Sequence, residues 1–112
     1  MDRGAVCEPV YVHTKLAIID DVWATIGSAN ICNRSFFGDT ELNASFWHAE
    51  TTRRLRVDLL SAHHGGDLST LSMADALDAL ALRAEENRAR QRRSEPIEGH
   101  ALAIDAASWG TE

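Results

Sequence analysis

The sequence has few of the residues that build disulfide-rich or metal-stapled folds. Its 112 residues include two cysteines, Cys7 and Cys32, whose surroundings match neither CxxC nor a Cys/His spacing. A disulfide framework and a zinc site are therefore not expected. Two free thiols are typical of a reducing compartment, so the cysteine content predicts a cytoplasmic protein that binds no metal.

Long apolar runs and an excess of basic residues are also lacking. No stretch approaches the roughly 20 apolar residues of a membrane-spanning helix, and the opening MDRGAVCEPV contains no signal-peptide core. Eleven Lys and Arg stand against 17 Asp and Glu, which gives a formal net charge of −6. This balance argues against a broad electrostatic surface for nucleic acid or membranes, but it allows a local basic pocket. The ordinary apolar and charged content predicts a soluble globular chain of one domain at most.

The apolar pattern of the first half predicts three strands. Residues 9–20 form either a strand pair or one long strand, because the apolar run LAII has the composition of a buried strand. The dipeptide Asp20-Asp21 is a turn signal that leads into a second strand at 22–26, and the two form a hairpin. Residues 28–40 are expected to be a loop, and residues 42–47 alternate in the manner of a third strand.

The second half predicts two helices. Residues 50–63 place leucines at helical spacing, with Arg53, Arg54 and Arg56 largely on the opposite face, and Gly65-Gly66 ends the helix. Ser72 is the expected N-cap of a second helix over 73–93. The polar end of that helix is expected to fray into solvent, and residues 100–105 to form a short strand. The fold class is therefore α/β, a hairpin and a third strand followed by two C-terminal helices.

One 18-residue window gathers polar residues suited to phosphate chemistry. If residues 9–20 are a strand, His13 and Lys15 point to the same side, so an imidazole lies beside an ammonium. The lysine can hold anionic oxygens while the histidine attacks phosphorus or moves a proton. The hairpin would bring Ser28 and Asn30 back toward them as hydrogen-bond donors. Such chemistry requires no metal or other cofactor, and none is predicted.

These residues carry a resemblance to a known family. The string HTKLAIID followed by GSAN resembles the HxKxxxxD and GSxN signature of the phospholipase D superfamily. The segment NICNRSFFGDTEL resembles the family's continuation, and RRLRVDLLSAHHG resembles its C-terminal end. The likeness covers about residues 9–93 and implies a phospholipase D-like half-domain.

The resemblance implies roles for individual residues. His13 would be the nucleophile or the general acid, and Lys15 and Asn30 would hold the phosphate together with Ser28. Asp20 would mainly anchor the turn behind the site. Glu41 would accept a hydrogen bond from the proton-bearing nitrogen of His13 and so fix the tautomer of the imidazole ring.

The family's active centre contains two copies of the signature, and this chain has one. Small single-motif relatives supply the second copy by dimerising, whereas larger relatives carry both in one chain. Only 12 residues precede His13, so we expect the C-terminal piece of a two-motif protein that lacks the N-terminal part of the half-domain. Its expected parts are a motif-bearing core at 9–64, a helix at 72–93 and a tail at 94–112.

The implied function is phosphodiester cleavage or phosphatidyl transfer through a phosphohistidine, as in cardiolipin-synthase-like enzymes. The expected partners are a phospholipid or other phosphodiester substrate, with possible membrane association, and a second signature-bearing half. A nuclease-like homodimer is the first alternative, which the acidic charge disfavours. An inactive fragment or interaction module is the second.

Plainer interpretations accompany each residue. A single histidine in a strand is commonly a packed core residue, Ser28 and Asn30 favour turns in any case, and Glu41 could be a surface carboxylate. The pair His63-His64 at a helix end is better explained by the helix dipole than by a metal. The arginine-rich run at 83–93 lacks aromatics and contains acidic residues, so a solvated helix face fits it better than nucleic-acid binding.

Overall fold

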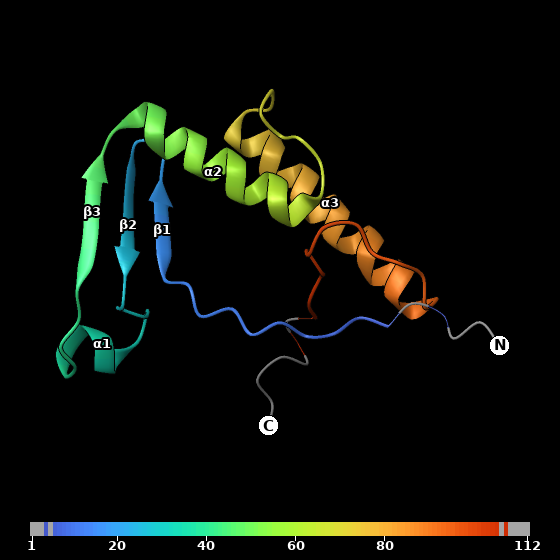
Figure 1. Cartoon of the computed structure of the whole chain (residues 1–112), viewed down its shortest axis with the longest axis horizontal. Coiled ribbons are helices and arrows are strands. Elements are labelled where there is room, and N and C mark those ends of the chain that lie inside the picture. The colour runs from blue at the N-terminus through green and yellow to red at the C-terminus, as the bar shows by residue number, and fades with distance from the viewer. Residues whose placement is uncertain (1–3, 5, 106, 108–112) are drawn as a thin grey trace. The chain divides into compact units, whose positions relative to one another are not determined.

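The computed structural model describes residue 4, residues 6–105 and residue 107. The chain divides into two compact units, which are described separately (Figure 1). The first unit comprises residues 10–56 and contains the signature residues. The second unit comprises the described residues before 10 and after 56.

The first unit is built on a three-stranded antiparallel sheet. Its strands are β1 (Leu16–Ile19), β2 (Trp23–Gly27) and β3 (Asn43–Trp47), in the order β1-β2-β3 (Figure 1). Leu16 pairs with Ile26 in one ladder, and Trp23 pairs with Trp47 in the other. The predicted hairpin and third strand are therefore confirmed, and with the helices that follow they confirm the α/β fold class.

The prediction of a strand over residues 9–20 is wrong for its first part. Residues 9–15 form no strand, and β1 begins at Leu16. The reason is that β2 ends at Gly27, whose N–H donates to the Lys15 carbonyl over 3.2 Å, so β2 offers no further partner to earlier residues. The expectation that His13 and Lys15 share one face of a strand therefore does not hold.

The turn between β1 and β2 has an unusual backbone conformation. Asp20 and Asp21 both have positive φ, 52° and 55°, and the Val22 N–H donates to the Ile19 carbonyl over 3.1 Å. Two successive positive φ values are the requirement of a type I′ turn, whose twist matches that of a hairpin. Aspartate tolerates this region better than most residues, which explains the acidic pair at this position.

The sequence predicts that the segment between β2 and β3 is a loop, but this prediction is wrong in part. The segment contains a short helix, α1 (Asn33–Phe37), at the end of the sheet away from the β1–β2 turn (Figure 1). Arg34 stabilises its C-terminal end, because its carbonyl accepts from the Gly38 N–H and its side chain pairs with Asp39 at 3.3 Å. Loop-favouring residue types obscured this single helical turn.

The helix that follows β3 anchors the hairpin turn. Helix α2 (Ala49–His64) confirms the predicted helix, and it begins in the first unit and ends in the second. Arg56, expected on its solvent-facing side, is only 5% exposed. Its Nε and Nη2 donate to the two carboxylate oxygens of Asp21 over 3.0 and 2.6 Å. The ion pair explains why an arginine is buried here.

The second unit contains helix α3 (Met73–Arg92), as predicted. The Ser72 hydroxyl accepts a hydrogen bond from the Asp75 N–H over 3.1 Å, which confirms the N-cap. The expectation of a frayed C-terminal end is wrong, because Asn87 is fully buried. Within the described part of the chain, neither this helix nor any other is long and apolar enough to cross a bilayer.

Asn87 is buried because it binds the backbone of the segment after α3. Its amide nitrogen donates to the carbonyls of Glu98 and Ala101 over 2.7 and 2.9 Å, and its oxygen accepts from the Glu98 N–H over 3.0 Å. The Ala101 carbonyl lies within the predicted strand, and the N–H groups of His100 and Ala101 donate to the His63 carbonyl, so these groups are not available to a neighbouring strand. Residues 100–105 accordingly form no strand, which corrects the prediction.

Candidate active site

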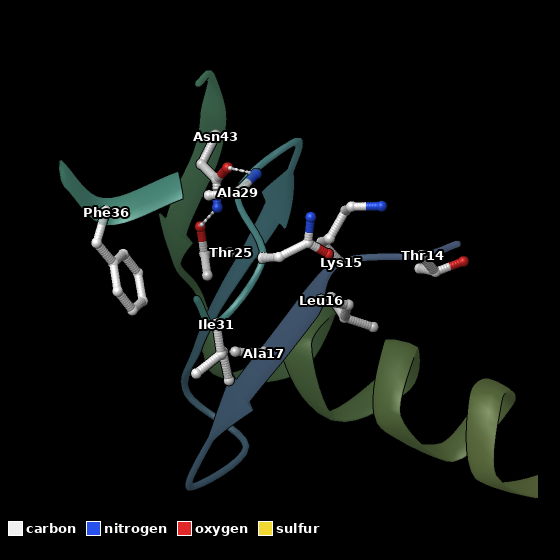
Figure 2. A pocket seen from close by; sticks show the side chains of 10 residues that line it. Thr14, Lys15, Leu16, Ala17, Thr25, Ala29, Ile31, Phe36 and Asn43 are labelled. Atoms are coloured by element: carbon white, nitrogen blue, oxygen red, sulfur yellow. Dashed lines mark hydrogen bonds between the residues drawn. The ribbon is translucent and has the colours of Figure 1, made fainter. Parts of the chain in front are cut away.

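A pocket lies at the end of the sheet where β1 begins and β2 ends. It has a volume of about 400 Å³. Two of the residues predicted to hold phosphate, Lys15 and Asn30, line it. Figure 2 shows Lys15 beside Thr14 and Leu16 at the start of β1. The rest of the lining is mixed, with Thr14, Thr25 and Asn43 as polar members and Leu16, Ala17, Ala29, Ile31 and Phe36 as apolar ones. The structure thus brings the lysine and the asparagine to one cavity.

Lys15 is the only lysine of the sequence and lies directly before β1. Its side chain is half-buried, and its ammonium donates a hydrogen bond to the carbonyl of His13 over 2.7 Å. An ammonium has three donors, so this contact leaves capacity for anionic oxygens of a ligand. The hydrogen bond to His13 thus fixes the direction of the lysine side chain and leaves two of its N–H donors for a ligand.

His13 lies two residues before Lys15, in the extended segment that precedes β1. Its ring is exposed and stacks at a tilt against Tyr11, with 5.9 Å between the ring centroids. It is not part of the lining of the pocket. His13 thus directly precedes Thr14 and Lys15, which do line the pocket, and the Tyr11 ring is its observed neighbour.

The turn after β2 is fixed by contacts with β3. The Ser28 hydroxyl accepts from the Leu42 N–H over 2.9 Å, and the Asn43 carboxamide oxygen accepts from the Ala29 N–H over 3.2 Å. Asn43 also donates to the Thr25 hydroxyl over 3.1 Å, and Figure 2 shows its amide bridging the two residues. Ser28 therefore has a structural task here, and no motif in the sequence pointed to Asn43.

Glu41 is half-buried between α1 and β3. Its carboxylate accepts a hydrogen bond from the Ser35 hydroxyl over 2.9 Å, which is a different partner from the histidine that the resemblance implied. Hydrogen bonding by Ser28, then by Ser35, lowers the pKa of Glu41, and the charges of Lys15 and Arg34 act in the same direction. The carboxylate is therefore held in its charged form near the pocket lysine.

Asp20 lies at the other end of β1, in the hairpin turn, and does not line the pocket. Its neighbour Asp21 pairs with Arg56, and this pairing lowers the pKa of Asp21. The signature aspartate is thus a turn residue beside a buried ion pair. The sequence predicts the turn, but no local pattern predicts that Arg56 binds Asp21.

The histidines near the end of α2 provide backbone contacts. The His63 carbonyl accepts from the N–H groups of His100 and Ala101 over 2.8 and 3.1 Å.

Across the residues that the structure describes, no group of three or more His, Cys, Asp or Glu side chains is placed to hold a metal ion.

A family described as cardiolipin synthase, PLD-like domain matches residues 3–62 of this chain, which is more than half of its length. The chain belongs to the phospholipase D superfamily. The match includes every signature residue discussed above, from His13 to Glu41, and confirms the resemblance drawn from the sequence.

Curated relatives extend the same likeness. The chain is 40% identical over 50 residues to a cardiolipin synthase of Geobacillus sp. (strain WCH70), covering 45% of this chain and 10% of that protein. It is 40% identical over 67 residues to phospholipase D alpha 4 of Arabidopsis thaliana, covering 54% and 9%. It is 51% identical over 88 residues to phospholipase D of Phytophthora infestans, covering 63% and 5%. The chain thus spans a tenth or less of these relatives.

No solved structure matches the chain significantly.

Proposed function

We propose that the chain carries one half of a phosphodiester site of the phospholipase D type, with His13 as the nucleophile. The observation that carries the proposal is the pocket that Lys15 and Asn30 line together, with His13 two residues from the lysine. A cation and an amide donor at one cavity provide the groups that stabilise an anionic phosphorane-like transition state.

The proposed reaction has two balanced steps. A nitrogen of His13 attacks phosphorus, an N–P bond forms, and the P–O bond to the leaving alcohol breaks while a general acid protonates the departing oxygen. Water or a second alcohol then attacks phosphorus, loses its proton to the same acid–base group, and releases the histidine. Hydrolysis and phosphatidyl transfer differ only in the attacking molecule.

The remaining signature residues have supporting roles in this proposal. Lys15, Ser28 and Asn30 hold the phosphate oxygens. Asp20 keeps the hairpin turn in shape. The Glu41 carboxylate accepts a hydrogen bond from the protonated ring nitrogen of His13. This contact requires the exposed imidazole to rotate toward Glu41 when substrate binds.

A second signature-bearing half is part of the proposal. In the first unit, many large apolar side chains are exposed, among them Ile31 at 94% and Phe37 at 85%. We infer that other polypeptide or lipid covers part of these exposed side chains. We infer that a homodimer partner or another chain segment, such as the remainder of a half-domain, completes the site.

The proposed parts of the chain are a motif-bearing core at 9–64, a helix at 72–93 and a tail at 94–112.

The proposed substrate is a phospholipid. The pocket has an apolar wall of Ile31 and Phe36 beside its phosphate-holding residues, which suits a molecule with a phosphodiester and an apolar body. Named relatives include cardiolipin synthases and phospholipases D. The net charge of −6 disfavours the phosphate backbone of nucleic acid.

The test compares the wild-type chain with His13→Ala on three substrates, namely phospholipid vesicles, bis(p-nitrophenyl) phosphate and single-stranded DNA. We expect release of headgroup from the vesicles and a loss on the order of 10³-fold or more in His13→Ala, because the nucleophile is removed. His100→Ala is the matched control, since this exposed histidine lies in the second unit.

When the phosphorus of the lipid is labelled, the label should become covalently attached to the wild-type chain. Acid should release it, as expected for an N–P bond, and no label should attach to His13→Ala. Full activity of His13→Ala would reject the assigned nucleophile. Turnover of DNA in preference to lipid, together with a dimer in sedimentation, would favour the nuclease-like homodimer. A folded chain that turns over none of the three substrates would favour an interaction module.

A further inference from the structure

The side chain of Ser35 joins two parts of the pocket region that are distant in sequence. We propose that Ser35 is a positioning residue, which ties the backbone of Asn30 to the carboxylate of Glu41 and holds both in the arrangement that the phosphate site needs. The inference rests on the proposed function and assigns a task to a residue for which the sequence suggested none.

The hydrogen bonds of Ser35 form a complete set. Its Oγ accepts from the Asn30 N–H over 3.1 Å and from the Cys32 thiol over 3.5 Å, and it donates to Glu41 Oε1 over 2.9 Å. A hydroxyl has one donor and two acceptor positions, so all three are used. Because both acceptor positions face donors, the hydroxyl proton is directed at Glu41.

This direction favours one charge state of Glu41. A hydroxyl that donates to a carboxylate stabilises the ionised form, whereas a protonated acid would have to find an acceptor that Ser35 no longer offers. The same bond contributes, after that of Ser28, to the lowered pKa of Glu41. Ser35 therefore keeps a negative charge in a fixed place, near the positive charge of Lys15.

A merely structural role in α1 explains the geometry less well. The other four residues of the helix are exposed, and Ser35 alone among them is half-buried. Besides the thiol of the N-cap residue Cys32, the Ser35 hydroxyl contacts the Asn30 N–H, which lies outside the helix. Its bonds lead out of α1 in two directions, toward the loop after β2 and toward the entry to β3.

The first arm of the test measures Glu41 directly and needs no catalysis. Carbon-13 NMR titration of the Glu41 carboxyl is compared between the wild-type chain, Ser35→Ala and Ser35→Thr. We expect Ser35→Ala to raise the pKa of Glu41 and Ser35→Thr, which keeps the hydroxyl, to restore it. Ser45→Ala is the matched control, because it loses a bond of similar length, 2.8 Å, to Thr25 and not to Glu41.

The second arm measures turnover of phospholipid vesicles against pH. We expect Ser35→Ala to lower kcat/KM by roughly 10- to 100-fold, as small misplacements near a reacting centre do. Its acidic limb should move to higher pH, because a Glu41 of raised pKa loses its charge earlier as the pH falls. Ser35→Thr should recover both properties, and Ser45→Ala should match the wild type.

The outcomes separate this inference from the proposed function. An unchanged Glu41 pKa in folded Ser35→Ala, or an unmoved acidic limb, overturns the role of Ser35. If the alanine variant does not fold, Ser35→Cys replaces it, and its weaker donor should still raise the Glu41 pKa. Absence of turnover in the wild-type chain would count against the proposed function, whereas the NMR arm would still decide whether Ser35 controls Glu41.

Discussion

The two ends of the three-stranded sheet are stabilised by different kinds of contact. At the anchored end, defined by Asp20, Asp21 and Arg56, a tight turn meets a buried ion pair. At the open end, defined by Lys15, Asn30 and Asn43 around the pocket, neutral hydrogen bonds connect loops in exposed or half-buried positions. The signature of the family is thus divided between a support and a site.

The difference has a physical reason. A charge pair removed from water is stable only with good geometry, and removing one partner leaves the other uncompensated. Such a contact suits a scaffold that must not move. Neutral hydrogen bonds at a wet surface contribute less and exchange with water or ligand more readily. Contacts at the open end can therefore yield to a ligand such as the proposed phosphate, while the anchored end keeps the strands in register.

The largest effect is expected from Arg56→Ala, which breaks the anchored end. The substitution leaves the Asp21 carboxylate without its partner, and loss of one member of a buried pair costs about 3 kcal/mol. Urea unfolding followed by circular dichroism measures the change. The matched control is Arg54→Ala, an exposed arginine two residues earlier on α2, which should change the free energy of unfolding by less than about 0.5 kcal/mol.

The pH dependence of that difference checks its cause. Arg56 lowers the pKa of Asp21 in the folded chain, so the pair's contribution is fully present above the unfolded pKa of about 3.9. It is lost as the pH falls through the lower folded pKa. The gap in stability between the wild type and Arg56→Ala should narrow in acid. A gap that stays constant would show that packing of the arginine, not its charge, stabilises the turn.

A smaller effect is expected from Gly27→Ala, which disturbs the open end. An added Cβ would collide with the Asn43 side chain and the Leu42 carbonyl, and overpacking of this kind costs about 1–3 kcal/mol. Phosphate affinity, measured by line broadening of phosphorus NMR signals, should fall as the loop carrying Asn30 shifts.

Gly38→Ala provides the control for this substitution. Its Cβ would meet Arg34 only at ordinary contact distance, and its φ of −127° suits any residue. We expect it to match the wild type in stability and in phosphate affinity. Equal behaviour of the two variants would contradict the close approach of β2 and β3 at Gly27.

The smallest effect is expected from Asp20→Gly, which sharpens the division between support and site. Glycine adopts the positive φ of 52° without strain but loses more backbone entropy on folding, so the net change should be within about 0.5 kcal/mol. Turnover should be unchanged, because the residue lies away from the pocket. A large loss of turnover in this stable variant would assign Asp20 a part in the chemistry.

Local signals predicted most of the fold but not its side-chain partners. The run Leu16–Ile19 and the Asp20-Asp21 pair specify a strand and a turn by composition alone, and Ser72 marks the start of α3. The predicted strand reaches too far toward Val10, because the apolar pattern does not show where the neighbouring strand ends. The sequence predicts a frayed end around Asn87, because the backbone partners of this residue lie eleven or more residues away in sequence.

The sequence by itself determined the family, the hairpin with its third strand, the two long helices and the residue types of the proposed site, because the signature is long and lies in a strand-turn-strand pattern. Only the tertiary structure decided which residues meet. It separated Asp20 from Lys15 by the length of β1, joined Asp21 to Arg56, and gave Glu41 the hydroxyl of Ser35. Pairings across loops depend on where the chain returns, and no local pattern of amino acids encodes that return.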